Sequence, residues 1–248
     1  SNIPDFAKYI RYFEDDDWRK YFIKYTYDTN SDQELIMIAD VDIICHEKND
    51  GEGIIYFGAA PTSIEGVAGN VLTIEIPEGV TTIGSSAFSN CLFLESISLP
   101  QSLTHIGGAA FYRCPSLKSV HLADLNAWFN ISMGSNRSCP FNNGADLYIN
   151  GELVTDIVVP AEIQAITLPL FHGCSSIKSV DLNNVFFVNN WAFTGCKSLE
   201  KFTGICASAD GKSLFNDVHL MAIAPAEMTE YVVPEHVSVI CSYAFMNS

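Results

Sequence analysis

The chain has 248 residues, enough for one large domain or two small ones, and 48% of them are hydrophobic. Only 17% are charged, below the roughly 25% usual for soluble domains, which favours an architecture with many buried positions. Against 13 Lys and Arg stand 29 Asp and Glu, a formal net charge of −16. This excess of negative charge repels phosphate backbones, so no nucleic-acid partner is expected.

No transmembrane segment is expected either, because no stretch approaches the roughly 20 apolar residues that a spanning helix needs. The most apolar window, residues 185–193, is broken by Asn189 and Asn190. The first five residues lack the basic and apolar regions of a signal peptide. A mature or trimmed chain would look the same, so the opening residues do not favour the cytoplasm.

Residues 1–40 are expected to form a helical N-terminal cap. Pro4 suits a first helical turn, and residues 14–17 (Glu-Asp-Asp-Asp) are a solvated face or a break between two helices. They lack the glycine and distal glutamate of a calcium loop. The apolar side chains that recur at helical spacing are Phe6, Ile10, Phe13, Trp18, Phe22 and Tyr25.

Residues 41–248 are expected to form a repeat domain, in which residues 53–57 and Ile64 make a degenerate first copy. A proline, an isoleucine, a phenylalanine and a cysteine then recur at fixed offsets, the signature of a stacked array. The copies are Pro77, Ile83, Phe88 and Cys91; Pro100, Ile106, Phe111 and Cys114; Pro160, Ile166, Phe171 and Cys174; a shortened one with Phe193 and Cys196; and Pro234, Ile240 and Phe245, with Ser248 at the cysteine offset.

Each copy is preceded or followed by a short strand pattern, as in residues 94–99, 117–122 and 177–182. Period-two alternation puts Ile97 and Leu99 inward and Ser96 and Ser98 outward. The proline ends the strand pairing because it has no N–H to donate. The Ile-Gly pair then marks a second short extended piece, and Ala-Phe a compact helical or irregular turn.

Such units are too short to bury their own apolar faces, so they must stack. With strands about 4.8 Å apart, the repeated phenylalanines and cysteines form ladders. Cysteine serves there as a small buried hydrophobe, although disulfides between adjacent turns remain the alternative. The ladder cysteines are Cys91, Cys114, Cys174 and Cys196.

Two intervals in the array are longer than the usual period, and the 52 residues from Phe193 to Phe245 leave room for a further unit. Phe111, Phe141 and Phe171 are 30 residues apart, which indicates that one longer unit is inserted in the stack. Asn150-Gly151 between two alternating triplets predicts a two-residue β-hairpin, because both residues tolerate positive φ.

The motif Ile-Pro-x-x-Val-Thr-x-Ile-Gly-x-x-Ala-Phe-x-x-Cys-x-x-Leu-x-Ser-Ile resembles the BspA-like leucine-rich repeat of surface proteins from anaerobic bacteria and some protists. The resemblance covers about residues 54–248 and implies expanded repeats at residues 124–153 and 210–225. It implies a leucine-rich-repeat solenoid, a right-handed superhelix of short β-strands and short helical turns. It also implies adhesion outside the cell or at its surface.

Nothing in the residue pattern predicts catalysis, a metal or a cofactor. The six histidines are scattered, and no pair has the helical spacing of metal ligands. The cysteines occupy repeat positions, which disfavours a Cys–His nucleophile. Gly107-Gly108 belongs to the repeat turn and not to a phosphate loop.

The expected site is therefore the outward face of the strands, which over about eight turns is on the order of 35–40 Å long. Small polar side chains over that length suit a broad ligand such as a host protein or glycan. A structural spacer in a larger surface protein is the alternative. The outward residues are Thr73, Glu75, Ser96, Ser98, Ser119, His121, Ser179, Asp181, Lys201 and Thr203.

The last copy stops before the strand that should follow it, so the domain is expected to be truncated or open at this end. Val237, Ile240 and Phe245 would then lie on an uncovered turn, whereas solenoids usually finish in a polar cap. Three outcomes stay open: the chain continues, two molecules associate end to end, or the edge is tolerated.

Overall fold

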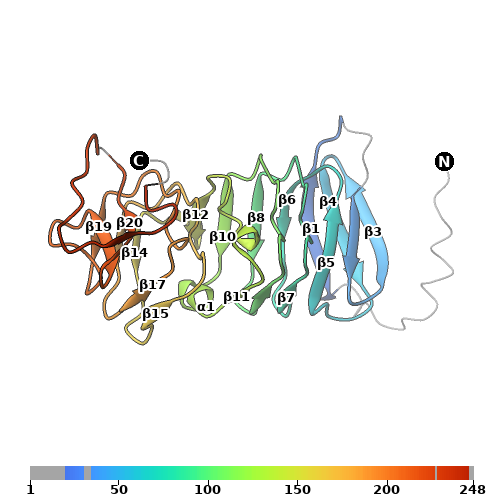
Figure 1. Ribbon diagram of the computed structural model, residues 1–248. Coiled ribbons are helices and arrows are strands. Elements are labelled where there is room, and N and C mark those ends of the chain that lie inside the picture. The colour runs from blue at the N-terminus through green and yellow to red at the C-terminus, as the bar shows by residue number, and fades with distance from the viewer. Residues whose placement is uncertain (1–19, 31–34, 227, 246–248) are drawn as a thin grey trace.

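A computed structural model of the chain describes residues 20–30, 35–226 and 228–245. They form an elongated stack of short strands, a β-solenoid of about eight turns with very little helix (Figure 1). Position along the stack largely follows position in the sequence, because each turn packs on the preceding one. The predicted repeat solenoid is confirmed.

The largest sheet, here called the first sheet, has the strand order β13-β12-β10-β8-β6-β1-β4-β3. Its middle strands β6, β8, β10 and β12 are parallel, whereas antiparallel pairs occupy both ends. Its members are β1 (Phe22–Tyr27), β3 (Ile43–Asn49), β4 (Glu52–Phe57), β6 (Val71–Glu75), β8 (Ser96–Leu99), β10 (Ser119–Leu122), β12 (Asp146–Ile149) and β13 (Glu152–Leu153).

A second sheet has the order β11-β9-β7-β5-β2. Each complete turn of the N-terminal half contributes one strand to the first sheet and one to the second, with the apolar core between them. Its members are β2 (Ile36–Ala39), β5 (Ser63–Ala68), β7 (Thr82–Ile83), β9 (His105–Ile106) and β11 (Ser132–Met133).

Three smaller sheets continue the stack towards the C-terminus. The third sheet holds β14 (Asp156–Val158), β16 (Ser179–Asp181) and β18 (Lys201–Thr203); the fourth β15 (Ala165–Ile166) and β17 (Phe187–Val188); the fifth β19 (Ser213–Asn216), β20 (His219–Ile223) and β21 (Val239–Ile240). The helix α1 (Leu125–Phe129) and the 3₁₀ turn η4 (Asn136–Ser138) lie in the first lengthened repeat.

The repeat phenylalanines form the predicted ladder. The rings of Phe88 and Phe111 are parallel within 8°, with centroids 5.2 Å apart, and Phe171 and Phe193 stack at 5.7 Å and 7°. Phe141 of the lengthened repeat lies 6.4 Å from Phe171 in a tilted arrangement. All five rings are buried, so aromatic contact runs along the core.

The ladder thiols are buried as predicted, and they also act as hydrogen-bond donors. Cys114 Sγ lies 3.0 Å from the carbonyl of Phe88, and Cys196 Sγ lies 3.2 Å from that of Phe171. These two thiols therefore donate to carbonyls of the preceding turn. Burial raises the pKa of Cys114 to about 11. The four ladder cysteines are free thiols in the structure: Cys91, Cys114, Cys174 and Cys196.

The hairpin at Asn150-Gly151 is confirmed. Both residues have positive φ, 53° and 80°, and the turn joins β12 to the antiparallel β13. Because β13 runs against β12, it ends the parallel part of the first sheet.

The helical cap is wrong where the structure describes it. Phe22–Tyr27 is strand β1 and Ile36–Ala39 is strand β2; residues 1–19 lie outside the described part. In β1 the side chains of Ile23 and Tyr25 are buried, whereas Lys24 is exposed. This period-two burial, supplied by antiparallel partners β4 and β6, overrides the helical spacing of the aromatic residues.

The predicted degenerate first repeat is half right. Ile64 in β5 pairs with Ile83 in the parallel register of the later repeats. Residues 53–57 instead belong to β4, which pairs antiparallel with β1 and β3. Strands β1 and β2 share sheets and core with β4 to β6, so the division of the chain at residue 40 remains a prediction.

Candidate binding face

Two rows of outward side chains cross the first sheet. Parallel register aligns Thr73 with Ser96 and Ser119, and the next row contains Glu75, Ser98 and His121. The intervening side chains are buried, as in the alternation of β8 and β10. Six of the ten predicted residues thus lie together on one surface.

The antiparallel strands extend both rows, which sequence reasoning missed. Lys24 lies opposite Glu75, and Thr26 lies opposite Thr73, with their hydroxyl oxygens 2.8 Å apart. Over β1, β4 and β6 the surface is hollowed by about 340 Å³, and Glu52 lines this hollow beside those four residues. The signal for β1 was present as the alternation Ile-Lys-Tyr-Thr-Tyr in residues 23–27, but the helical spacing of the aromatic residues masked it.

At the other end of the rows, Tyr148 of β12 was also missed. It lies beside His121, and the two rings stack with centroids 4.8 Å apart and 22° between planes. Partial burial lowers the pKa of His121, so its imidazole is neutral at pH 7. The alternating residues 147–149 before the Asn-Gly turn were the signal for Tyr148.

The other four predicted residues lie on the third sheet. Ser179 and Lys201 align with Asp156, and Asp181 aligns with Thr203. The β12–β13 hairpin separates this sheet from the first one, so the ten residues do not form one continuous ladder. Hydrogen bonds from the hydroxyls of Ser179 and Thr155 lower the pKa of Asp156.

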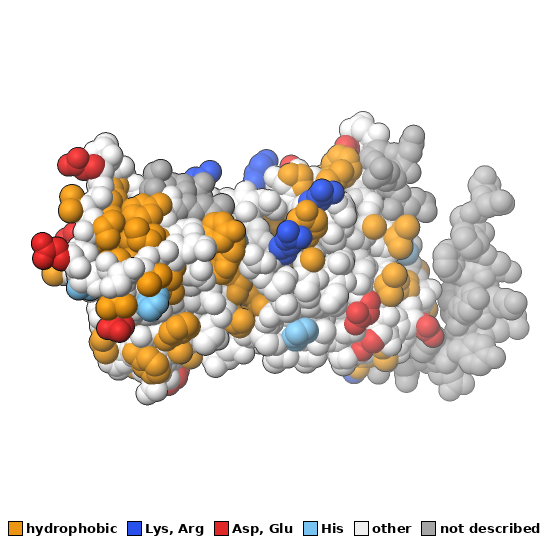
Figure 2. Space-filling model, in the orientation of Figure 1, with side chains coloured by type: hydrophobic (Ala, Val, Ile, Leu, Met, Phe, Trp, Pro, Cys, Tyr) orange, Lys and Arg blue, Asp and Glu red, His pale blue; other side chains and the backbone are white. Residues whose placement is uncertain are grey.

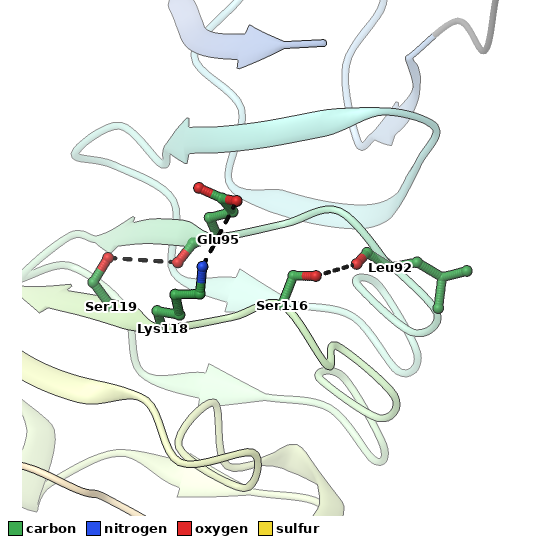
Figure 3. A network of polar contacts seen from close by, with 5 residues as sticks. All are labelled: Leu92, Glu95, Ser116, Lys118 and Ser119. Atoms are coloured by element: carbon green, nitrogen blue, oxygen red, sulfur yellow. Dashed lines mark hydrogen bonds and ion pairs between the residues drawn. The ribbon is translucent and has the colours of Figure 1, made fainter. Parts of the chain in front are cut away.

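Side chains beside the rows tie neighbouring turns together (Figure 3). Ser116 Oγ donates to the carbonyl of Leu92 at 2.7 Å, and Lys118 Nζ lies 3.9 Å from Glu95 Oε1. Both charged side chains are largely exposed, so this ion pair contributes little to stability. The hydroxyl-to-carbonyl hydrogen bond links consecutive turns in addition to the backbone pairing of β8 with β10.

Neither a metal site nor a membrane helix is found among the residues that the structure describes. No three His, Cys, Asp or Glu side chains gather there as metal ligands would. No described helix is long and apolar enough to cross a bilayer.

Comparisons with known proteins agree with the geometry. The model of the BspA type leucine rich repeat region matches residues 68–138 and 144–248 in six copies. No protein of curated function matches the chain.

The chain is also similar to solved structures of leucine-rich repeat proteins. A leucine-rich repeat protein from Eubacterium ventriosum is 17% identical, with 90% of this chain and 57% of that one covered and a TM-score of 0.46. A leucine rich cell surface protein from Faecalibacterium prausnitzii is 19% identical, with 89% of this chain and 68% of that one covered and a TM-score of 0.37. The T. pallidum leucine rich repeat protein is 20% identical, with 60% of this chain and 81% of that one covered and a TM-score of 0.30.

The chain therefore spans 57% of the length of the E. ventriosum protein. The stacked Phe88, Phe111, Phe171 and Phe193 all lie within the residues that the family model matches. This protein belongs to the BspA-type leucine-rich repeat family.

Proposed function

We propose that this protein is a non-catalytic binding protein that works outside the cell or at its surface. Leucine-rich repeat domains are generally protein-interaction modules, and BspA-like proteins are typically bacterial surface proteins. The ligand would be a host protein or glycan that contacts the first-sheet face over several turns.

One observation carries this proposal: the two outward rows are continuous and in register across parallel and antiparallel strands. Hydroxyls from Thr26, Thr73, Ser96 and Ser119 lie in one row. Short polar side chains cost little entropy when they are immobilised, so this face suits a broad, multi-point contact. The four predicted residues on the third sheet would form a second, smaller contact area for the same ligand.

The test compares Ser98→Arg in the middle of the first sheet with Ser132→Arg on the second sheet. Binding to immobilised host matrix proteins and mucin glycans is measured by surface plasmon resonance. Ser98→Arg should abolish binding because a long side chain holds the ligand away from the rows, whereas Ser132→Arg should bind like the parent. If the two variants bind with equal affinity, the first-sheet face does not bind the ligand, and a structural spacer is favoured.

A further inference from the structure

A second hollow, of about 430 Å³, lies on the turns that carry the repeat phenylalanines and not on the first-sheet face. Its walls come from neighbouring turns that stacking brings together, although 131 residues separate the first from the last in sequence. The side chains that matter here are Tyr112, Arg113, Arg137, His172, Trp191 and Tyr243.

The positive charge of this hollow is unusual for the chain. Arg113 and Arg137 are the two arginines among the described residues, and both line it. Their guanidinium carbons lie 5.2 and 4.9 Å from the centroid of the Tyr112 ring. Neither forms an ion pair with a carboxylate of the described residues. In a protein of net charge −16, this is a local reversal of charge.

The backbone of Arg113 adds an independent argument. Its φ is 59°, in the left-handed region, and it stands two residues after a repeat phenylalanine. Other turns have Asn90, Gly173 and Gly195 at that offset, and these residue types tolerate positive φ. An arginine is unfavourable there, and residues held in such conformations cluster at functional sites.

The opposite wall is aromatic. Trp191 is half-buried, and its ring centroid lies 4.0 Å from that of Tyr243. His172 meets Trp191 edge-on at 5.2 Å, and its Nδ1 lies 2.8 Å from the carbonyl of Thr194. Burial lowers the pKa of His172, so Nδ1 donates to that carbonyl and Nε2 remains an acceptor.

We propose that this hollow binds an acidic sugar, a pyranose that bears a carboxylate. Guanidinium groups pair bidentately with carboxylates, and the ring of Trp191 offers a flat surface to the apolar face of a pyranose. Neutral His172 accepts a hydrogen bond from a hydroxyl. The volume is within the range of about 300–1,000 Å³ typical of small-molecule sites.

The experiment titrates the protein with glucuronic acid, N-acetylneuraminic acid, glucose and inorganic sulfate in separate runs. Ligand-observed NMR measures binding in each run. The acidic sugars should bind, and glucose and sulfate should bind at least about tenfold more weakly, because each lacks one of the two contacts. Methyl glycosides and sialylated oligosaccharides distinguish a free sugar from the end of a glycan.

Arg113→Asn is the informative variant, because asparagine occupies this offset at Asn90. We expect unchanged or improved thermal stability and a loss of acidic-sugar binding of about tenfold or more. Trp191→Ala should weaken sugar binding but leave sulfate binding unchanged. Lys118→Ala, which removes an exposed cation elsewhere, is the matched control.

Absence of acidic-sugar binding to the parent protein would overturn the proposal. Equal affinity for sulfate and the acidic sugars would do so too, because the hollow would then be a general anion site. The two proposals can fail separately. The protein can bind acidic sugars in the hollow without binding a ligand on the first-sheet face, and it can bind a ligand on that face without binding acidic sugars.

Discussion

At the scale of single residues, the repeat phenylalanines and cysteines hold neighbouring turns in contact. Phe111 is 1% exposed and stacks on Phe88, and Cys114 of the same turn donates to the carbonyl of Phe88. One turn thus uses a ring for packing and a thiol for hydrogen bonding against the same neighbour.

We predict that Phe111→Ala lowers the free energy of unfolding by about 3–5 kcal/mol through the cavity that it leaves. Damage should spread to adjacent turns, because each turn packs only on its neighbours. Thermal unfolding followed by circular dichroism measures the change. Phe93→Ala, at a ring that is 42% exposed, is the control and should change the melting temperature little. A Phe111→Ala protein that melts with the parent contradicts the ladder at that position.

Thiol labelling should separate two classes of cysteine. Cys91, Cys114, Cys174 and Cys196 are buried and should react only after denaturation, because the thiolate is the reactive form. Cys45 and Cys241 are partly exposed and should react first. Mass spectrometry after a timed pulse reports each site, and a disulfide between ladder cysteines in the intact mass argues against the free-thiol ladder.

Alkaline pH should destabilise the fold. Burial raises the pKa of Cys91 to about 12 and of Cys114 to about 11, from an ordinary value of 9.0. A raised pKa means that stability is complete below pH 9 and is lost as the pH rises towards 11 and beyond, at up to about 1.4 kcal/mol per pH unit for each thiol. Urea unfolding at several pH values should give a shallower loss for Cys114→Ala than for the parent. Identical slopes would show that this thiol does not contribute.

At the scale of elements, the turn after each second-sheet strand depends on close backbone approach. A Cβ at Gly134 would lie 2.5 Å from the nitrogen of Gly108, and a Cβ at Gly107 would collide with the nitrogen of Ser85. The Ile-Gly pair of the repeat is thus a packing requirement between consecutive turns.

Two adjacent glycines give a matched test of that requirement. Gly107→Ala should lower the free energy of unfolding by about 1–3 kcal/mol, because backbone atoms must move apart. At Gly108 a Cβ would meet only Ser85 Oγ at 4.0 Å, so Gly108→Ala should be neutral or slightly stabilising. Denaturant titration of the two variants decides the point, and equal effects would contradict the close approach.

At the scale of the whole molecule, the two ends of the described stack differ. The antiparallel strands β1, β3 and β4 close the N-terminal side, whereas β21 is the edge strand of the fifth sheet. Val239 is 41% and Ile240 51% exposed, although the equivalent Ile106 is fully buried. Figure 2 shows hydrophobic side chains gathered over this C-terminal third.

We predict that this edge mediates end-to-end self-association, since an uncovered strand exposes both apolar surface and unpaired backbone groups. Light scattering over a concentration series should detect assembly in the parent, and Ile240→Lys should reduce it. Val158→Lys, at another exposed aliphatic residue on the third sheet, is the control. Monomers at every concentration would show that the edge is tolerated.

Periodicity in the sequence determined the repeat unit and the ladders of Phe and Cys, because residues at the same offset in successive repeats lie above one another in the stack. The Asn150-Gly151 hairpin was determined by the sequence too, because it depends only on local residues. The same alternation identified outward residues such as Ser98 and Ser119 without coordinates. Tertiary structure alone decided that Phe22–Tyr27 is a strand, since the partners that bury Ile23 come from β4 and β6. It also decided which turns line the arginine hollow, because Arg113 and Trp191 are brought to one hollow only when the intervening repeats have stacked.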